Sequence, residues 1–308
     1  MSPEICTKTL KLNSGYEIPN VGFGTFRASE EDTYNSVLTA LKNGYKHIDT
    51  AYVYRNESSV GKAIKDSGIP REQLFITTKL WNTDHRKASE ALDASLKRLG
   101  LEYVDLYLMH WPVPFHPAKT EEEDQFFVVN KSTGEYDNDL EWDFIKTYEL
   151  MQELVPTGKT KSIGVSNFSK KSLEKLLNSA NLKIKPACNQ VELHPFLPQF
   201  DLLEFCQKND IQLEAYAPLG SHDSNLMNDE IIKTLSEKLE VSPATLLISW
   251  AVWRGTVPLP KSVTESRIIS NIKIIDLDEE VGGKINEISK IRGEKRLFNR
   301  NWGIPVFD

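Results

Sequence analysis

Four ionisable side chains fall at the ends of three consecutive predicted strands or just beyond one of them. Asp49 ends the second predicted strand, Lys79 the third and His110 the fourth, while Tyr54 lies on the loop after Asp49. If the strands run parallel, their carboxyl ends share one rim and these groups converge there. Each residue alone would more often be structural, as a helix cap, a surface lysine or a core histidine. Together they favour a catalytic site.

The chemistry that these groups could perform is proton transfer to a polarised oxygen. A phenol titrates near ~10, so Tyr54 is a weak acid at neutral pH unless a cation stabilises its phenolate. We expect Lys79 to lower the pKa of Tyr54, Asp49 to keep Lys79 charged, and His110 to hydrogen-bond a substrate oxygen. The sequence shows neither a nucleophile–base pair nor a metal-ligand spacing. Reduction of a carbonyl would then need a hydride, which proteins take from a cofactor.

Strands and helices alternate along most of the chain, which predicts an α/β protein with parallel strands. The segment 22–27, GFGTFR, lacks the third glycine of a dinucleotide-binding fingerprint, so a Rossmann domain is disfavoured. Eight strand–helix units instead predict a single (β/α)8 TIM barrel domain over residues 1–308. The predicted strands are 21–24, 47–49, 74–79, 104–110, 162–165, 187–192, 212–216 and 257–259. The first predicted helix begins near Ser29. The other predicted helices span 58–67, 86–99, 139–154, 170–178, 198–209, 229–239 and 265–271.

Three further segments complete the predicted architecture. Residues 7–18 alternate polar and apolar types around Asn13-Ser14-Gly15, which predicts a β-hairpin plugging the bottom of the barrel. The connection 112–139 after the fourth strand is too long for a simple turn and is either functional or a solvated insertion. The tail beyond residue 291 carries Trp302, Ile304 and Phe307, so we expect it to fold across a cavity rim.

Composition narrows the possible partners and compartment. A net charge of −7 and a pI of about 5.5 argue against nucleic-acid or anionic-membrane partners. The sequence contains no long apolar run for a membrane span and no signal-peptide core near its start. Cys6, Cys188 and Cys206 have no metal-ligand spacing and are predicted to be reduced, mostly buried thiols. We therefore expect a cytoplasmic protein.

Three stretches carry a resemblance to a known family: GYKHIDTAYVYRNESSVG at 44–61, KTKSIGVSNF at 159–168 and LPKSVTESRIISN at 259–271. On these, and over nearly its whole length, the chain resembles the aldo-keto reductases. It looks most similar to the fungal NADP-dependent glycerol dehydrogenase and ketoester reductase group. The resemblance implies an NADPH/NADP+ cofactor, a small-molecule carbonyl substrate and a monomer. It also implies a tetrad of Asp49, Tyr54, Lys79 and His110, with Tyr54 as general acid.

The resemblance implies further site residues. Ser166, Asn167 and Gln190 match residues that bond the nicotinamide carboxamide, and Tyr216 matches the one that stacks on its ring. Other implied cofactor residues surround the pyrophosphate, the adenosine and its 2′-phosphate: Gly24, Thr25, Phe26, Arg27, Asp49, Leu219, Ser221, Asp223, Lys261, Ser262, Val263, Thr264, Arg267 and Asn271. The implied substrate pocket comprises Phe26, Val53, Tyr54, Trp81, His110 and Trp111.

Lys261 and Arg267 also support NADPH over NADH from their own chemistry. They stand where the last predicted strand enters a helix, and backbone N–H groups at a helix start favour an anion. Arginine pairs well with phosphate oxygens. The alternative is a solvated basic edge without a cofactor role.

Some positions depart from the family pattern, and the function stays open at a finer level. Phe26 stands where many members have Trp, Ala217 replaces a frequent Ser, and Ser270 stands where many members carry an acid or amide toward the adenine. The loop 220–228 looks short for closure over the cofactor.

The leading hypothesis is a reductase of aldehydes and ketones, including ketoesters and diketones. The alternatives are a glycerol or sugar oxidoreductase, an NADPH-binding regulatory protein with slow turnover, and a structural protein recruited from the family.

Overall fold

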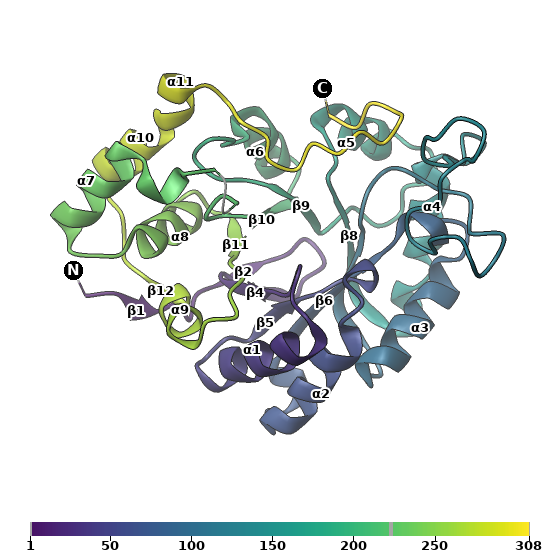
Figure 1. Cartoon of the computed structure of the whole chain (residues 1–308), viewed down its shortest axis with the longest axis horizontal. Coiled ribbons are helices and arrows are strands. Elements are labelled where there is room, and N and C mark those ends of the chain that lie inside the picture. Colours follow the sequence, from purple (N-terminus) through teal and green to yellow (C-terminus); the bar gives the residue numbers. More distant parts are fainter. Residues whose placement is uncertain (1, 222–223, 308) are drawn as a thin grey trace.

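Eight parallel strands form the barrel of the computed structural model, which describes residues 2–221 and 224–307. Each strand is hydrogen-bonded to its sequence neighbour, and Gly24 N donates to Pro260 O at 3.1 Å between the first and last strands (Figure 1). This confirms the predicted (β/α)8 barrel. The strands are β4 (Gly22–Gly24), β5 (His47–Asp49), β6 (Phe75–Leu80), β7 (Val104–Met109), β8 (Thr160–Ser166), β9 (Cys188–Glu192), β10 (Gln212–Tyr216) and β11 (Val257–Leu259).

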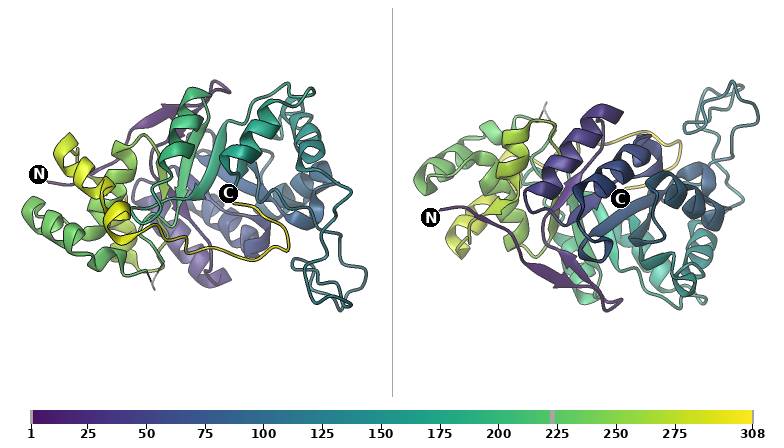
Figure 2. Two further views of the ribbon diagram at one scale, coloured as in Figure 1. Left: turned by 90° about the horizontal axis from the view of Figure 1, so that it is seen from above. Right: turned by 90° about the horizontal axis from the view of Figure 1, so that it is seen from below.

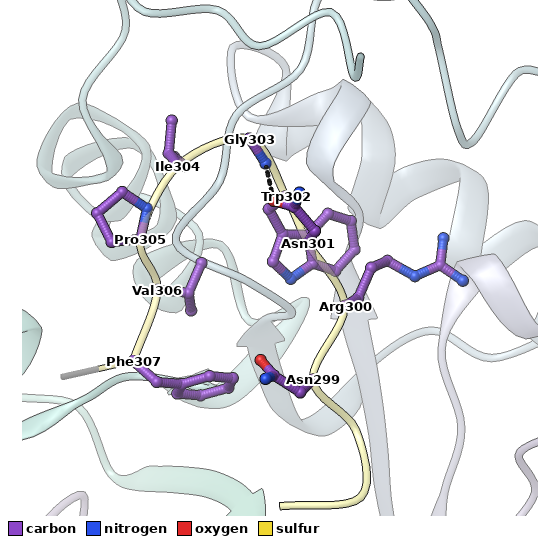
Figure 3. A pocket seen from close by; sticks show the side chains of 9 residues that line it. All are labelled: Asn299, Arg300, Asn301, Trp302, Gly303, Ile304, Pro305, Val306 and Phe307. Atoms are coloured by element: carbon purple, nitrogen blue, oxygen red, sulfur yellow. Dashed lines mark hydrogen bonds between the residues drawn. The ribbon is translucent and has the colours of Figure 1, made fainter. Parts of the chain in front are cut away.

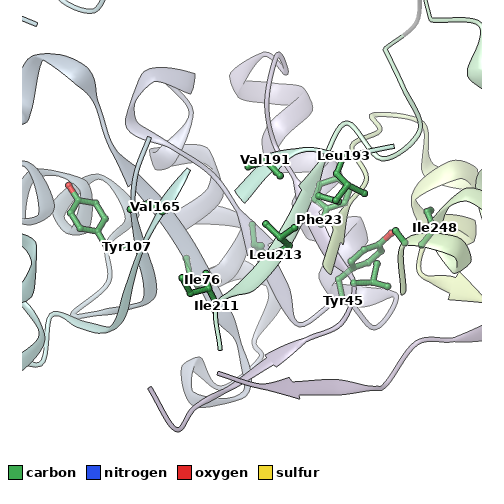
Figure 4. Close-up of a cluster of buried hydrophobic side chains, with 14 of the residues drawn as sticks. Phe23, Tyr45, Ile76, Tyr107, Val165, Val191, Leu193, Ile211, Leu213 and Ile248 are labelled. Atoms are coloured by element: carbon green, nitrogen blue, oxygen red, sulfur yellow. The ribbon is translucent and has the colours of Figure 1, made fainter. Parts of the chain in front are cut away.

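Burial on both faces explains why these short segments form strands. Every residue of β6 and β7 is buried, as expected for parallel strands that have helices outside and packed side chains inside. Figure 4 shows part of the main core, where Ile76 and Leu213 project from strands and Ile248 from a helix. This packing fixes the carboxyl ends of neighbouring strands relative to one another.

Helices surround the strands (Figure 1). The α-helices are α1 (Glu30–Lys42), α2 (Glu57–Ser67), α3 (Ala88–Leu99), α4 (Phe144–Gln152), α5 (Lys170–Leu177), α6 (Phe200–Lys208), α7 (Glu230–Leu239), α8 (Pro243–Trp253), α9 (Glu265–Asn271), α10 (Glu279–Asn286) and α11 (Ile288–Arg292). Short 3-10 turns are η1 (Tyr52–Tyr54), η2 (Arg71–Gln73), η3 (Asn82–Asp84), η4 (Val155–Thr157) and η5 (Leu226–Asn228). None of the helices in these described ranges is both long and apolar enough to cross a membrane.

Helix starts follow capping chemistry, and this corrects two predicted boundaries. Ser29 caps α1 by accepting from Asp32 N, as the sequence indicates. The prediction that a helix begins at 139 is wrong. The cap of α4 is Asp143, which accepts from Ile145 N, whereas Asp139 accepts two hydrogen bonds from Arg86, which lies just before α3. Arg86 itself lies outside α3, which begins two residues later than predicted.

Helices α8, α10 and α11 and strands β1 (Glu4–Ile5) and β12 (Lys273–Ile274) were not predicted. Helix α8 is apolar nearly all round because it is largely buried, so it lacks the polar face that marks a surface helix. Helix α10 contains two adjacent glycines, which are poor helix formers. Strands β1 and β12 form an antiparallel pair only two residues long, too short for an alternation pattern.

The N-terminal hairpin closes the amino-terminal ends of the barrel strands, as predicted. It consists of β2 (Thr9–Lys11) and β3 (Glu17–Pro19). Leu12 and Ile18 pack into an apolar cluster with residues from β6, β7, β9 and β11. Asn13 Nδ2 donates to two backbone carbonyls just ahead of β9 and β10. With this end filled, the opposite end is left for a site.

The long connection and the tail lie at that opposite end. Residues 110–143 contain neither a helix nor a regular strand, apart from isolated bridges, and project from the barrel (Figure 2). The tail beyond α11 crosses the carboxyl ends of the strands, and Trp302 packs against Trp81 and Trp111. The expectation that the tail covers the rim is confirmed.

Candidate active site

A buried ion pair forms the base of the site at the carboxyl ends of β5 and β6. Lys79 Nζ donates to both carboxylate oxygens of Asp49 at 2.7 and 2.8 Å and to Thr50 O at 2.9 Å. The two side chains are only 1% and 5% exposed, so the pair is shielded from water. Gln190 Nε2, from β9, adds a bond of 2.8 Å to Asp49 Oδ2. All three hydrogens of the ammonium therefore have acceptors.

Tyr54 and His110 lie directly above this pair. Tyr54 ends the 3-10 turn η1 after β5, and His110 follows β7, where its N donates to Leu80 O at 3.0 Å. The rings of Tyr54 and His110 have centroids 5.7 Å apart, and Lys79 Nζ lies 5.1 Å from the centroid of the phenol ring. The structure thus brings all four predicted tetrad residues together.

The expectation that Lys79 lowers the pKa of Tyr54 is wrong. Burial, followed by the charge of Asp49, raises the pKa of Tyr54 well above its ordinary value. Lys79 donates its hydrogen bonds to Asp49 and to Thr50 O, and the negative charge of Asp49 offsets the effect of the lysine charge on the phenol. Burial and then Lys79 hold the pKa of His110 well below its ordinary range. At neutral pH the site therefore presents a protonated phenol and a neutral imidazole.

The residues predicted to bind a carboxamide form one network with this tetrad. Tyr216 Oη, at the end of β10, donates to Asn167 Oδ1 at 2.8 Å. Asn167 Nδ2 donates to His110 O at 2.9 Å and to Ser166 Oγ at 3.2 Å. Asn167 has a left-handed backbone, with φ of 61°, a conformation that is uncommon outside glycine and often marks functional sites. Ser166 Oγ in turn donates to Gln190 O at 2.7 Å.

The predicted residues at the start of the barrel lie on the same rim. Thr25 is buried and its hydroxyl donates to Asp49 O at 3.0 Å. Phe26 is 41% exposed, and its ring centroid is 5.0 Å from that of Tyr54. A side chain at Gly24 would meet Leu259 O at 3.2 Å, so the backbones of β4 and β11 approach closely there. Leu219 and Ser221 are half-buried, whereas Asp223 lies outside the described residues.

The basic segment after β11 is partly exposed. Lys261 Nζ reaches Arg27 O at 3.4 Å, and burial lowers the pKa of Lys261. Arg267 is exposed on α9. Within residues 2–221 and 224–307, neither Lys261 nor Arg267 lies within ion-pair distance of a carboxylate. Ser262 and Asn271 are buried, while Val263 and Thr264 are exposed beside them.

The predicted apolar pocket residues join an aromatic cluster with the loop and the tail. Trp81 Nε1 donates to Phe126 O at 2.7 Å, and the rings of Trp111 and Trp302 lie 4.8 Å apart. Val53 packs half-buried against the same cluster. The tail bends round a pocket of about 440 Å³ lined by residues 299–307 (Figure 3). This pocket adjoins the cluster at the rim and is not lined by the tetrad itself.

Phe126 and Phe298 were not among the predicted pocket residues. Phe298 lies against Phe26 and Tyr216, with centroids 6.3 and 5.7 Å apart. Aromatic residues within otherwise polar segments are the signal that could have identified both. The described part of the chain contains no cluster of three or more metal-ligating side chains.

Comparison with known proteins identifies the family. The model of the aldo/keto reductase family matches residues 20–290. The chain belongs to the aldo/keto reductase family. It is 55% identical to glycerol 2-dehydrogenase (NADP(+)) of Saccharomyces cerevisiae, over 96% of this chain and 95% of the yeast protein. It is 52% identical to aldehyde reductase YPR1 of the same yeast, over 97% and 96% of the two chains.

Solved structures agree with this assignment. The aldose reductase of Schistosoma japonicum superposes with a TM-score of 0.87 at 34% identity, over 95% of this chain and 94% of the other. The family resemblance carried by the three sequence stretches and the barrel predicted from the strand–helix units are both confirmed.

Proposed function

We propose that this aldo/keto reductase uses NADPH to reduce aldehydes and ketones to alcohols, with Tyr54 as the general acid. The observation that carries the proposal is the convergence of the Tyr54 phenol and the His110 imidazole on the buried Lys79–Asp49 pair. A phenol held protonated by burial can give up its proton only when a basic oxygen forms next to it. The carbonyl oxygen of a substrate becomes such a base as it is reduced.

The residues around the tetrad fit a nicotinamide dinucleotide that carries a 2′-phosphate. Ser166, Asn167 and Gln190 would hold the carboxamide, and the half-exposed ring of Tyr216 would lie against the nicotinamide. The cationic groups of Lys261 and Arg267 suit the 2′-phosphate, because charge-assisted bonds to phosphate are strong. When bound, NADPH supplies the hydride.

The chain's own residues then have distinct tasks. Tyr54 Oη would donate its proton to the carbonyl oxygen, and His110 would orient that oxygen by a hydrogen bond. Lys79 Nζ lies 5.1 Å from the centroid of the phenol ring, where its charge, although paired with Asp49, would offset part of the charge of the phenolate left behind. Asp49 holds Lys79 in place by two hydrogen bonds. The tail and the loop after β7 would limit access of water at the carboxyl ends of the barrel strands.

We propose compact carbonyls with an apolar or ester arm, such as ketoesters and diketones, as the preferred substrates. The aromatic lining of Phe26, Trp81, Trp111 and Trp302 favours apolar groups. The similarity to glycerol 2-dehydrogenase (NADP(+)) supports a second candidate, the oxidation of glycerol or a related polyol. The same proton and hydride would then move in the opposite direction.

Tyr54→Phe tests the proposal. The variant removes only the hydroxyl, and general acid catalysis is worth about 10²–10⁴-fold, so kcat should fall by about that factor. NADPH binding, followed by quenching of protein fluorescence, should stay unchanged. Tyr52→Phe, on the same 3-10 turn but against Phe126, is the matched control and should retain activity. A Tyr54→Phe enzyme with more than about a tenth of wild-type kcat would shift the acid role to His110.

A carbonyl panel assayed at 340 nm separates the two candidate functions. Higher kcat/KM for ketoesters than for dihydroxyacetone or glycerol would support the reductase. NADPH binding without turnover of any substrate would contradict both.

A further inference from the structure

Glu192 is a fully buried carboxylate that the proposed chemistry does not use. It ends β9, two residues beyond Gln190, and its side chain is 0% exposed. His194 Nε2 lies 2.9 Å from Oε1. The other two partners come from the C-terminal tail, where Leu297 N donates to Oε1 at 2.6 Å and Phe298 N donates to Oε2 at 2.8 Å. A carboxylate removed from water requires such donors.

The hydrogen bonds from Leu297 N and Phe298 N to Glu192 hold the tail close to the residues proposed to bind the cofactor. The tail forms no helix or strand in the described residues after α11. Lys295 N adds a bond of 2.8 Å to Phe196 O, on the loop that follows Glu192. Segment 295–298 is therefore held against the end of β9 and the loop after it. Without the carboxylate, two partly buried backbone N–H groups would lose their acceptors.

The anchored segment places one aromatic ring at the centre of the rim. Phe298 packs edge-on against Tyr216, with centroids 5.7 Å apart, and against Phe26 at 6.3 Å. The guanidinium of Arg27 lies 5.9 Å from the centroid of the Phe298 ring. Residues 299–307 continue directly from Phe298 and line the pocket of about 440 Å³ (Figure 3). Phe298 does not line this pocket itself, but it borders the tetrad through Phe26, whose ring contacts that of Tyr54.

We propose that Glu192 is a positioning residue that latches the C-terminal tail, so that Phe298 and residues 299–307 form the substrate side of the site. This inference rests on the proposed reductase function for its kinetic consequence, but the latch itself does not depend on turnover. Glu192 contacts the tail and His194, and no contact places it against the tetrad. Its loss should therefore weaken substrate binding more than it slows proton transfer.

Glu192→Gln tests the latch with little change of shape. The amide offers one acceptor oxygen, and its NH2 group faces the second backbone N–H, donor against donor. Hydrogen bonds to charged groups are strong enough that amide exchange of Leu297 and Phe298 should accelerate about ten- to a hundredfold. Hydrogen-exchange mass spectrometry of peptide 293–307 measures this exchange, whether or not the variant turns over substrate. KM for the best carbonyl substrate should rise about tenfold, while kcat changes less than threefold.

Two variants make the test specific. Glu204→Gln removes an exposed carboxylate of α6 that pairs with Lys208, and should change neither the exchange of the tail nor KM. Phe298→Ala keeps both backbone bonds to Glu192, so KM should rise without faster exchange at Leu297. If Glu192→Gln does not fold, the wild-type protein still tests the latch: the amides of Leu297 and Phe298 should exchange more slowly than those of residues 299–301, and equal exchange would overturn it.

Unchanged tail exchange in folded Glu192→Gln would overturn the latch. Faster exchange with unchanged KM would overturn its role in shaping the pocket. A wild-type protein that turns over no carbonyl would refute the proposed function, whereas the exchange result would still decide whether Glu192 holds the tail.

Discussion

Replacing Lys79 by methionine should destabilise the protein strongly, whatever its effect on activity. The substitution keeps an unbranched chain but removes three hydrogen bonds, two to Asp49 and one to Thr50 O. Asp49 would stay buried, with Gln190 Nε2 as its remaining side-chain donor. Breaking a buried pair by removing one partner costs about 3–5 kcal/mol. We therefore expect a loss of about 3–5 kcal/mol in the free energy of unfolding, which urea denaturation followed by tryptophan fluorescence measures.

A double-mutant cycle separates the pair from its surroundings. Adding Asp49→Asn to Lys79→Met removes the uncompensated carboxylate, so the double variant should be more stable than Lys79→Met alone. Contacting charged residues couple by about 0.5–3 kcal/mol. Lys62→Met, which breaks an exposed pair with Asp66 on α2, is the control and should change stability little. A Lys79→Met loss below about 1 kcal/mol, or additive effects of the two substitutions, would refute the reasoning.

Two further predictions concern the cofactor and the buried carboxyl group of Glu214. Arg267→Ala should weaken NADPH binding by about ten- to a hundredfold and NADH binding far less, measured by fluorescence titration; equal losses would rule out recognition of the 2′-phosphate by Arg267. Burial, followed by Asp49, raises the pKa of Glu214 to about 8. The folded state therefore binds the extra proton between the unfolded value of about 4.5 and pH 8, and stability should fall as pH rises through this window. In Glu214→Gln, the urea midpoint of unfolding should decrease less between pH 5 and pH 8 than in the wild type. An equal decrease in both proteins would show that Glu214 does not cause it.

The barrel strands could be predicted closely because short strand-like segments alternate with helical patterns along most of the chain. The bounds of β5, β10 and β11 coincide with the predicted ones. Helix α8 escaped prediction because of its burial. It is buried nearly all round, so its sequence has no polar face from which a helical period could be read.

The convergence of the tetrad could also be predicted, because it depends only on parallel strands with shared carboxyl ends. The direction in which the pKa of Tyr54 shifts could not be predicted, because it depends on which neighbours of Lys79 pair with its charge. Two bonds to Asp49 and one to Thr50 O leave the phenol to the effects of burial and of Asp49. Residue types predict which groups meet, whereas hydrogen-bond geometry decides their protonation.

The tail illustrates how far such reasoning extends once a fold is known. Its apolar residues predict that it covers a rim, but Leu297 is 105 residues from Glu192, and local patterning gives no sign of that contact. A charged residue at the end of a buried strand nevertheless implies that donors must come from elsewhere. Asp49, at the end of β5, finds these donors on the side chains of Lys79 and Gln190. Glu192, at the end of β9, instead takes two donors from the backbone of the tail, so the donors that a buried acid requires can come from a distant irregular segment.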